Sequence, residues 1–483
     1  MKVLSVASEC APFVKTGGLA DVVGALPKAL APLGVSMRVL LPGYPALGPL
    51  LKEGKTLWEA EHLPGGPARL VSVESGGIDL LLLDAPDLYD RPGNIYLNGD
   101  GQDWSDNAQR FAALSMVAAK VATGALADWQ PDLVHLHDWQ AGLTAAYLHQ
   151  SENPPPCITT IHNIAFQGLF DPILMTDLSL SSALYTSEGI EYFGRISFLK
   201  AGLVYADRIT TVSPTYAAEL MQPEFGMGLE GLLSARSADL SGILNGIDLD
   251  VWDPENDPAL AAPYSVKRLK PKAENKAAVL RRFGLQPGGD GPLFCVISRL
   301  TTQKGLDLLL DALPALVSRG ARLAVLGSGD AGLEAGFVSA AHRYPGSVGV
   351  IIGYDEPLSH LMQGGSDAIV IPSRFEPCGL TQLYGLRYGT LPVVARTGGL
   401  ADTVIDANEA ARVAGCATGV QFAPVTADAL EQALMRTCDL YAQPREWAGM
   451  MRRAMRHPVG WDTSAAAYHQ IYADVLSTRA AQE

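Results

Sequence analysis

The sequence of 483 residues has no long hydrophobic run and no apolar leader at its start. Nowhere do ~18 or more apolar residues follow one another, which is the length that a membrane helix needs. The chain begins Met-Lys-Val-Leu-Ser-Val-Ala, which is typical of a β-strand and not of a secretory signal. The six cysteines show no C-x-x-C spacing, so they indicate reduced thiols without structural zinc. We therefore expect a cytoplasmic protein with no membrane partner.

Positive charge is also scarce. The 36 Lys and Arg residues are outnumbered by 51 Asp and Glu residues, which gives a formal net charge of −15. A polyanion would be repelled overall, so no nucleic-acid partner is expected, although local cations can still bind a small phosphate. The glycine-rich loop near the amino terminus lacks the G-x-G-x-x-G spacing, and this disfavours an NAD-dependent oxidoreductase.

Short apolar runs alternate with helical patterns along the whole chain, which predicts an α/β protein with parallel sheets. A chain of this length suits two cores better than one. We predict two Rossmann-like, doubly wound domains at 1–250 and 291–457, facing a central cleft. The region 251–290 is predicted to be a linker, because 253–258 is rich in proline and polar residues. Residues 458–483 are predicted to form a terminal helix that packs back on the body.

The stretch 371–402 is the part of the chain on which we base the functional prediction for the remaining segments. An apolar strand at 368–371 is followed by a loop and then by a helix that we expect to begin near Gly379. The free N–H groups of Gly379, Leu380 and Thr381 would form an anion site. Glu376 lies just ahead of it and could bind the hydroxyls of a sugar nucleotide. In the alternative reading, Glu376 only caps the helix and Cys378 is a small buried residue.

A repeated motif supports the functional reading. Residues 397–402 read Thr-Gly-Gly-Leu-Ala-Asp, and the same six residues occur at 16–21. A basic residue precedes each copy, Arg396 in one case and Lys15 in the other. Two equivalent loops predict two similar domains that face the same cleft.

Two further strands of the amino-terminal half end in polar residues. Asp138 follows the strand at 133–137, and His162 follows the strand at 157–161. Open α/β sheets bind ligands at the carboxyl ends of their strands, so a functional role is favoured for both. His135 and His137 share one strand face, but no third metal ligand at suitable spacing is evident, so no metal is expected.

In the carboxyl-terminal half, Arg299 and Lys304 follow the strand at 292–297, and this pair fits a diphosphate. The alternative is that both are solvated surface residues. Tyr354 follows another strand, where it could stack on a nucleobase or be a partly buried aromatic residue. The polar segment 84–107 carries Tyr96 among Asp and Asn residues, which suits sugar contacts, or else forms a surface flap without a ligand.

Taken together, these residues resemble the bacterial glycogen synthase and plant starch synthase family, retaining glucosyltransferases of the GT-B fold. The resemblance covers the whole chain. Six motifs carry it in the family's order: K-T-G-G-L-A-D at 15–21, H-L-H-D-W at 135–139, T-I-H-N at 160–163, N-G-I-D at 245–248, R-L-T-T-Q-K-G at 299–305 and E-P-C-G-L-T-Q at 376–382.

The resemblance implies that ADP-glucose binds mainly to the carboxyl-terminal domain and that a glycogen or α-1,4-glucan acceptor enters from the amino-terminal side. No cofactor is implied. The implied catalytic residues are Glu376, His162, Arg299, Lys304 and Asp138. Donor binding is implied for Lys15, Gly18, Arg299, Lys304, Tyr354, Cys378, Gly379, Leu380 and Thr381, and binding of the acceptor or the transferred glucosyl group for Asp21, Tyr96, His162, Asn163 and Asn245.

Many relatives of the wider fold carry a second glutamate eight positions after the first, where this chain has Tyr384. The glycogen synthase branch shares this departure. Retention of configuration, with no carboxylate obviously placed as a nucleophile, favours same-face attack by the acceptor hydroxyl. Two other functions stay open from sequence: a non-catalytic glucan-binding protein, and a GT-B transferase that uses UDP-glucose with a different acceptor.

Overall fold

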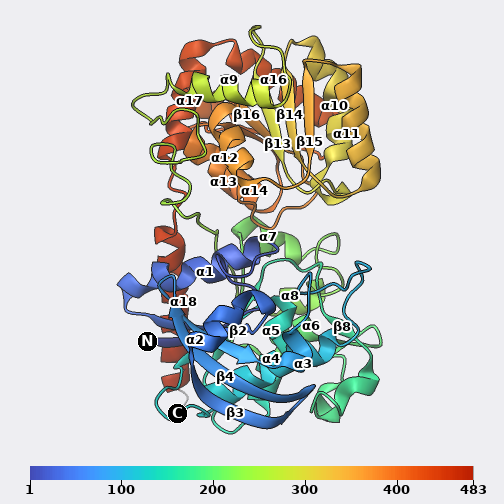
Figure 1. Ribbon diagram of the computed structural model, residues 1–483, viewed down its shortest axis with the longest axis vertical. Helices are drawn as coiled ribbons and strands as arrows, with labels where there is room; N and C mark the ends of the chain where they lie inside the picture. Colours follow the sequence, from blue (N-terminus) through green and yellow to red (C-terminus); the bar gives the residue numbers. More distant parts are fainter. Residues whose placement is uncertain (482–483) are drawn as a thin grey trace. The chain divides into compact units, whose positions relative to one another are not determined.

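The computed structural model describes residues 1–481, and its contacts divide the chain into two compact units (Figure 1). The first unit contains residues 1–245 and the segment from Trp461 onward, and the second contains residues 246–460. Each unit has its own sheet, mostly parallel in the first and wholly parallel in the second, with helices on both faces. The predicted α/β class with two Rossmann-like domains is confirmed.

The sheet of the first unit has nine strands in the order β12-β11-β7-β6-β1-β2-β5-β4-β3. All neighbours pair in parallel except the antiparallel pairs β3 with β4 and β4 with β5. The order reverses between β1 and β6, so this is the switch point of the sheet. The strands are β1 (Lys2–Val6), β2 (Ser36–Pro42), β3 (Lys55–Leu63), β4 (Gly66–Ser75), β5 (Ile78–Asp84), β6 (Leu133–His137), β7 (Cys157–Ile161), β11 (Arg208–Thr211) and β12 (Leu240–Gly242).

Helices cover both faces of this sheet (Figure 1). The last helix, drawn in red, runs beside the first, drawn in blue, and buries Tyr468 and Tyr472 in a core with residues of β1, β6 and β7. The helices of this unit include α1 (Gly18–Leu30), α4 (Asn107–Ala122), α5 (Asp138–His149), α6 (Phe198–Tyr205), α7 (Pro214–Leu220), α8 (Glu230–Ala235) and α18 (Asp462–Ala480). The end of the predicted terminal helix, residues 482–483, lies outside the described residues.

The second unit has a six-stranded, wholly parallel sheet in the order β15-β14-β13-β16-β17-β18. Its switch point lies between β13 and β16. The strands are β13 (Leu293–Ile297), β14 (Arg322–Gly327), β15 (Val348–Ile352), β16 (Ala368–Ile371), β17 (Leu391–Ala395) and β18 (Val420–Phe422). The helices include α9 (Lys272–Arg282), α10 (Leu306–Ser318), α11 (Ala331–Arg343), α12 (Glu356–Gly365), α13 (Thr381–Tyr388), α14 (Gly398–Thr403), α16 (Ala427–Tyr441) and α17 (Pro444–Arg456).

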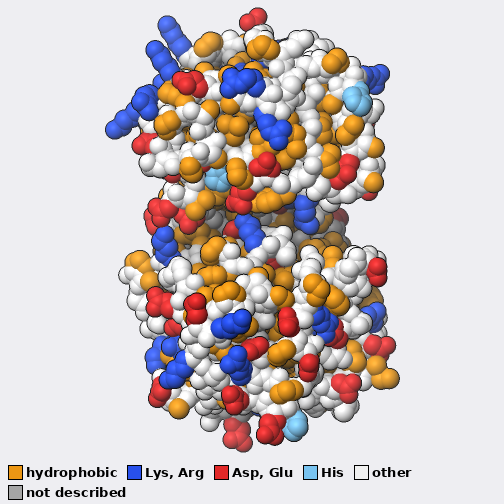
Figure 2. Space-filling view, viewed as in Figure 1, with side chains coloured by type: hydrophobic (Ala, Val, Ile, Leu, Met, Phe, Trp, Pro, Cys, Tyr) orange, Lys and Arg blue, Asp and Glu red, His pale blue; other side chains and the backbone are white. Residues whose placement is uncertain are grey.

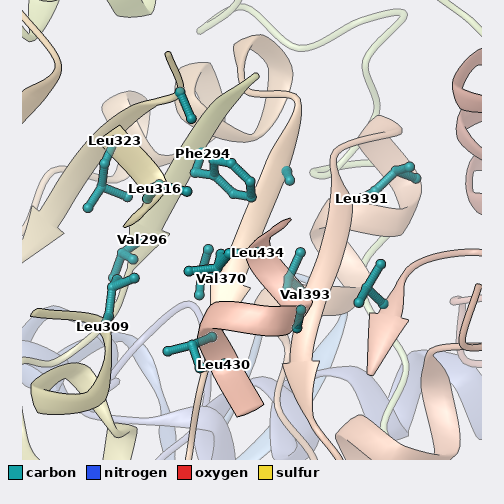
Figure 3. Packing of buried hydrophobic residues seen from close by; sticks show 14 of the residues in the cluster. Phe294, Val296, Leu309, Leu316, Leu323, Val370, Leu391, Val393, Leu430 and Leu434 are labelled. Atoms are coloured by element: carbon teal, nitrogen blue, oxygen red, sulfur yellow. The ribbon is translucent and has the colours of Figure 1, made fainter. Parts of the chain in front are cut away.

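Alternate residues of these strands enter two separate cores, because successive side chains of a strand point to opposite faces of the sheet. One core contains Phe294 and Val296, and the other contains Leu293 and Cys295. Figure 3 shows the first core, in which residues of the strands meet two helices. The labelled residues there are Phe294, Val296, Leu323, Val370, Leu391 and Val393 of the strands, and Leu309, Leu316, Leu430 and Leu434 of α10 and α16.

The region predicted as a linker, 251–290, packs as part of the second unit. Trp252 is 8% exposed, and its ring is stacked between those of His360 and Tyr384, at centroid distances of 3.8 and 3.6 Å. Residues 272–282 form helix α9, and the buried Lys272 donates to the carbonyl of Gly364. The segment 253–258 is therefore irregular, as its proline and polar residues indicate, but it is not a free connection. Its polar groups are bonded to the body of the unit.

Among residues 1–481, no helix is long and apolar enough to cross a membrane. On the face of each unit that Figure 2 shows, acidic and basic side chains are interspersed.

Candidate active site

At the carboxyl edge of the second sheet, three of the predicted site residues follow the two strands that flank the switch point. Arg299 and Lys304 come after β13, and Glu376 comes after β16. Lys304 Nζ lies 2.5 Å from Glu376 Oε2, which also accepts a hydrogen bond of 2.9 Å from the hydroxyl of Ser373. Glu376 is 7% exposed. The structure therefore brings the predicted lysine and glutamate together as a largely buried ion pair.

The alternative in which Glu376 caps the following helix is wrong. Helix α13 begins at Thr381, its N-cap residue is Leu380, and no side chain accepts a hydrogen bond there. The helix begins two residues later than expected, because Gly379 is in the left-handed region with φ 75°. The N–H groups of Leu380 and Thr381 precede any intrahelical acceptor, so they remain available to an anion at this helix end.

The loop before α13 is held from within by Gln382. Its Nε2 donates to the carbonyls of Cys378 and Gly379, at 3.0 and 2.9 Å. Glycine at 379 is favoured by the positive φ, and a Cβ there would also lie 2.5 Å from Gln382 Oε1 and displace that side chain. Cys378 is buried, as the alternative reading expected.

The second copy of the repeated motif packs directly on this loop. Gly399 N–H is 3.1 Å from the carbonyls of both Glu376 and Pro377. Gly398 has φ 43°, and a Cβ there would lie 2.0 Å from the carbonyl oxygen of Glu376. A Cβ on Gly399 would lie 2.3 Å from the carbonyl oxygen of Cys378. These two glycines let the chain pass closely behind the glutamate and hold it in place.

The prediction that the two copies are equivalent is wrong. The copy at 16–21 follows β1, the first strand of its sheet, whereas the copy at 397–402 follows β17, the fifth strand of the second sheet. In the first copy, Gly17 and Gly18 are exposed, and nothing lies within 4 Å of the position of a Cβ on Gly17. Lys15 Nζ pairs with Asp21 Oδ1 at 2.7 Å. Identical sequences open a helix in both places but have different packing environments.

Arg299 and Tyr354 are the most exposed of the predicted donor-binding residues in this unit. Tyr354 is 79% exposed, and its hydroxyl donates to Glu356 at 2.9 Å. The loop that carries Arg299 packs on the segment 327–332. This segment has the G-x-G-x-x-G spacing, and its first glycine is the last residue of β14. A Cβ on Gly327 would lie 1.9 Å from the carbonyl oxygen of Ser298, and one on Gly329 would lie 2.4 Å from that of Leu300. This glycine spacing serves contact between two loops at the sheet edge.

At the edge of the first sheet, Asp138 and His162 are brought together as predicted. Asp138 Oδ1 accepts the backbone N–H of His162 at 2.7 Å and that of Asn163 at 3.4 Å. Asp138 has φ 55°, a strained conformation for a residue with a side chain, and such strain clusters at functional sites. The pKa of Asp138 is raised to about 7, chiefly by burial and to a lesser extent by Glu9, while the two backbone hydrogen bonds oppose the shift.

Three histidines form a buried array behind Asp138. His137 Nδ1 and His162 Nε2 are 3.0 Å apart, and His137 Nε2 is 3.1 Å from the hydroxyl of Ser5. His135 is bonded to the hydroxyls of Tyr472 and Thr160, at 2.8 and 2.6 Å. Burial lowers the pKa of His135 and of His162 to about 3, so both rings are neutral at physiological pH.

In the described part of the chain, no three His, Cys, Asp or Glu residues are arranged to hold a metal ion. His137 links the ring of His162 to the hydroxyl of Ser5, and the nitrogens of His135 are bonded to hydroxyl groups, so His137 supports the ring of His162.

The remaining predicted residues of the first unit lie in different environments. The side-chain oxygen of Asn163 accepts the N–H of Ala165 at 3.0 Å. Asn245 is 8% exposed, and its Oδ1 has no partner among the described residues, as expected of a group that bonds a ligand. The hydroxyl of Tyr96 is bonded to Ser8 at 2.7 Å and to Glu9 at 2.5 Å, so its hydrogen bonds are made within the protein.

The segment 84–107 is folded onto the unit. Arg110 is 1% exposed and donates to the carbonyls of Leu88 and Ile95, at 2.8 and 2.9 Å. Arg91 pairs with Asp106 and stands over the ring of Trp104. Most of the polar groups that suggested sugar contacts therefore stabilise the segment itself.

Glu9 lies at the carboxyl edge of the first sheet, and the sequence did not single it out as a site residue. It is 3% exposed and accepts hydrogen bonds from Thr16, Gly17 and Tyr96. A signal was present, because Glu9 follows the first strand at the carboxyl edge, where ligands bind.

Tyr384, the departure from the wider fold, has a packing role. Its ring stacks on Trp252, with an interplanar angle of 13°. A glutamate there would lose this aromatic contact.

Comparison with known proteins matches a different family model to each unit. Residues 2–235 match the family model described as the starch synthase catalytic domain, and residues 281–450 match that of glycosyl transferases group 1. The chain is 71% identical over 477 residues to a glycogen synthase of Roseobacter denitrificans, covering 99% of this chain and 100% of the relative. It is 59% identical over 472 residues to a glycogen synthase of Paracoccus denitrificans, covering 98% of each.

A solved structure is similar over almost the same length. The catalytic domain of starch synthase IV from Arabidopsis thaliana, bound to ADP and acarbose, superposes with a TM-score of 0.87 at 29% identity, covering 98% of this chain and 99% of that one. The resemblance inferred from the six motifs is thereby confirmed. The chain belongs to the family of glycogen and starch synthases, which are glycosyltransferases of the GT-B fold.

Proposed function

We propose that the protein transfers glucose from ADP-glucose to the 4-hydroxyl at the non-reducing end of an α-1,4-glucan, with retention of configuration. The observation that carries this proposal is the Lys304–Glu376 pair at the switch point of the second sheet, next to the beginning of α13. A cation and a helix amino terminus suit a diphosphate, and a carboxylate suits sugar hydroxyls. The ADP in the related starch synthase IV structure supports an adenine nucleotide.

Breaking the bond between glucose C1 and the diphosphate leaves negative charge on ADP. Lys304, Arg299 and the N–H groups of Leu380 and Thr381 would stabilise that charge, because they are fixed in place before the reaction begins. Glu376 would hold the glucose hydroxyls while Lys304 neutralises its charge. The buried Gln382 and Gly399 contacts would keep this arrangement rigid.

Residues of the first unit would bind the transferred glucosyl group and the glucan. His162 is neutral and buried, so its ring can exchange hydrogen bonds with sugar hydroxyls without carrying charge. Asp138 holds the backbone of His162 in position, and Asn245 offers an unpartnered amide oxygen. Lys15 and Gly18 lie on an exposed loop and would contact the sugar nucleotide.

The acceptor hydroxyl would attack the same face of glucose from which ADP leaves, with the leaving phosphate taking its proton. Trapping of a covalent glucosyl-enzyme would contradict this step.

We also propose a cytoplasmic location, which the six unpaired cysteines support.

The first experiment is transfer of labelled glucose to glycogen, with ADP-glucose and UDP-glucose compared at equal concentration. We expect a strong preference for ADP-glucose and release of the label by an α-1,4-specific amylase. Activity with UDP-glucose alone would instead favour the alternative GT-B transferase, and binding to glycogen without turnover of either donor would favour a glucan-binding protein.

A further inference from the structure

A buried carboxylate at the edge of the first sheet has no part in the function described so far. Glu9 follows β1, is 3% exposed and forms no ion pair among the residues that the structure describes. Burying a charged group without compensation is costly, so such a residue needs partners that satisfy its oxygens.

Hydrogen-bond donors occupy both oxygens of Glu9. Oε2 accepts the backbone N–H groups of Thr16 and Gly17, the second at 3.2 Å. Oε1 accepts the hydroxyls of Thr16, at 2.6 Å, and of Tyr96, at 2.5 Å. One carboxylate therefore ties the loop at 15–18 to the segment at 84–107, which are far apart in the sequence.

The two ends of the loop are fixed by backbone contacts, because Val14 exchanges two hydrogen bonds with Cys10 and the carbonyl of Ala20 accepts one from Ala11. Residues 15–18 are exposed, and nothing lies within 4 Å of the place where a Cβ on Gly17 would stand. Between these ends, the hydrogen bonds that Glu9 accepts from Thr16 and Gly17 hold the backbone that follows Lys15. Lys15 is also restrained by its pair with Asp21, at 2.7 Å, but both side chains of that pair are partly exposed, so the pair is a weak restraint.

We propose that Glu9 is a positioning residue of the transfer reaction, which holds Lys15 for the sugar nucleotide and Tyr96 beside it through the four hydrogen bonds that its carboxylate accepts. This inference rests on the proposed role of the Lys15 loop in donor binding. It assigns to Glu9 no contact with the reacting atoms.

The hydrogen-bond pattern offers a conservative variant. In Glu9→Gln, the amide oxygen can replace Oε2 and accept the two backbone N–H groups. The amide nitrogen can replace Oε1, because the hydroxyls of Thr16 and Tyr96 can rotate to accept from it. Glu9→Gln therefore keeps all four hydrogen bonds while it removes the charge, whereas Glu9→Ala removes them all.

The test measures loop order and catalysis separately, on the full chain. Hydrogen–deuterium exchange of the peptide that covers residues 14–19 reports how strongly the Thr16 and Gly17 amides are protected. Steady-state kinetics with ADP-glucose and glycogen reports KM for the donor and kcat. We expect Glu9→Ala to speed exchange in this peptide and to raise KM for ADP-glucose at least about tenfold, and Glu9→Gln to keep both within about threefold of the wild type.

Asp207→Ala is the matched control. Asp207 Oδ2 also accepts a backbone N–H, that of Cys157 at 2.8 Å, but at the amino edge of the same sheet. Its loss removes one carboxylate hydrogen bond from the same unit, against four at Glu9, and we expect KM for ADP-glucose to stay at the wild-type value. A rise in KM equal to that of Glu9→Ala would show a general effect of destabilisation and would overturn the proposal.

Two other results would overturn it: unchanged exchange at residues 14–19 in Glu9→Ala, or faster exchange there with unchanged KM and kcat. Lys15→Ala distinguishes this failure from failure of the proposed donor site. If Lys15→Ala also leaves KM unchanged, the donor role of the loop is wrong. If Lys15→Ala raises KM and Glu9→Ala does not, only the positioning role of Glu9 is wrong.

Discussion

The ammonium group of Lys304 lies 2.5 Å from a carboxylate oxygen of Glu376, although the two residues follow different strands of the second sheet. Parallel strands that are neighbours deliver their following loops to the same edge, so residues separated by 72 positions meet there. Both side chains are largely buried, which makes the pair sensitive to loss of either partner.

We predict that Lys304→Ala loses ~2–4 kcal/mol of transition-state stabilisation, comparable to loss of one strong oxyanion donor. This corresponds to a fall in kcat/KM of about 30- to 900-fold. Steady-state kinetics with ADP-glucose checks it. Turnover at the wild-type rate would remove Lys304 from the site.

Lys276→Ala is the matched control for that measurement. Lys276 forms an ion pair of 2.6 Å with Asp367, with 19% and 13% of the two side chains exposed, but before β16 and thus at the opposite edge of the sheet. Its loss should lower stability and leave kcat/KM within about twofold of the wild type, because no site residue is near it.

Stability should depend on pH through the histidine array. Burial lowers the pKa of His135 to about 3, from an ordinary value of 6.5. Between these values the unfolded chain binds a proton that the folded protein does not, so the free energy of unfolding falls as pH falls from about 6.5 toward 3. One such group contributes a slope of up to about 1.4 kcal/mol per pH unit.

His135→Gln should reduce that slope by up to about 1.4 kcal/mol per pH unit, the contribution of one proton. Urea unfolding at pH 4 to 7 measures the slope. Asp138 contributes with the opposite sign, since its pKa is raised, but it is present in both proteins and its contribution cancels in the comparison. His342→Gln, which alters an exposed histidine, is measured beside it as the control. Equal slopes for His135→Gln and the wild type would contradict the prediction.

The repeated motif allows one substitution to be compared at matched positions. Gly398→Ala places a Cβ 2.0 Å from the Glu376 carbonyl oxygen at φ 43°, whereas Gly17→Ala meets no atom within 4 Å. Gly17 has extended backbone, with φ −157°. We expect Gly398→Ala to lower the free energy of unfolding of the second unit by about 2 kcal/mol or more and Gly17→Ala to change that of the first by less than about 1 kcal/mol. Urea unfolding of both checks this, and similar losses would contradict it.

The stack of Trp252 with Tyr384 and His360 should stabilise the second unit. Truncation of a buried tryptophan costs about 3–5 kcal/mol, so we expect Trp252→Ala to lose that much and Trp252→Phe to retain most of the stability, because an aromatic ring still fills the space. Thermal and urea unfolding measure the difference. A loss in Trp252→Ala below about 1 kcal/mol would show that residues 251–257 are a loose connection after all.

Much of the fold and the family followed from local patterns. The apolar runs at 368–371 and 292–297 predict buried parallel strands, because both of their faces are covered. Motifs such as 299–305 and 376–382 identify the family, since each places its polar residues directly after such a strand. These features depend on neighbours in the sequence, so the sequence by itself determined them.

Tertiary structure decided those features that depend on the order of the strands in a sheet and on close contact between loops. The strand order alone brings Lys304 to Glu376, and the packing of one loop on another turns the motif copy at 397–402 into a support for the loop that carries Glu376. Glu9 is an ordinary glutamate in the sequence, and its importance appears only where the donors of Thr16, Gly17 and Tyr96 converge on it. The proline-rich segment at 253–258 resembles a linker locally, yet it is held to the body because Trp252 stacks on Tyr384.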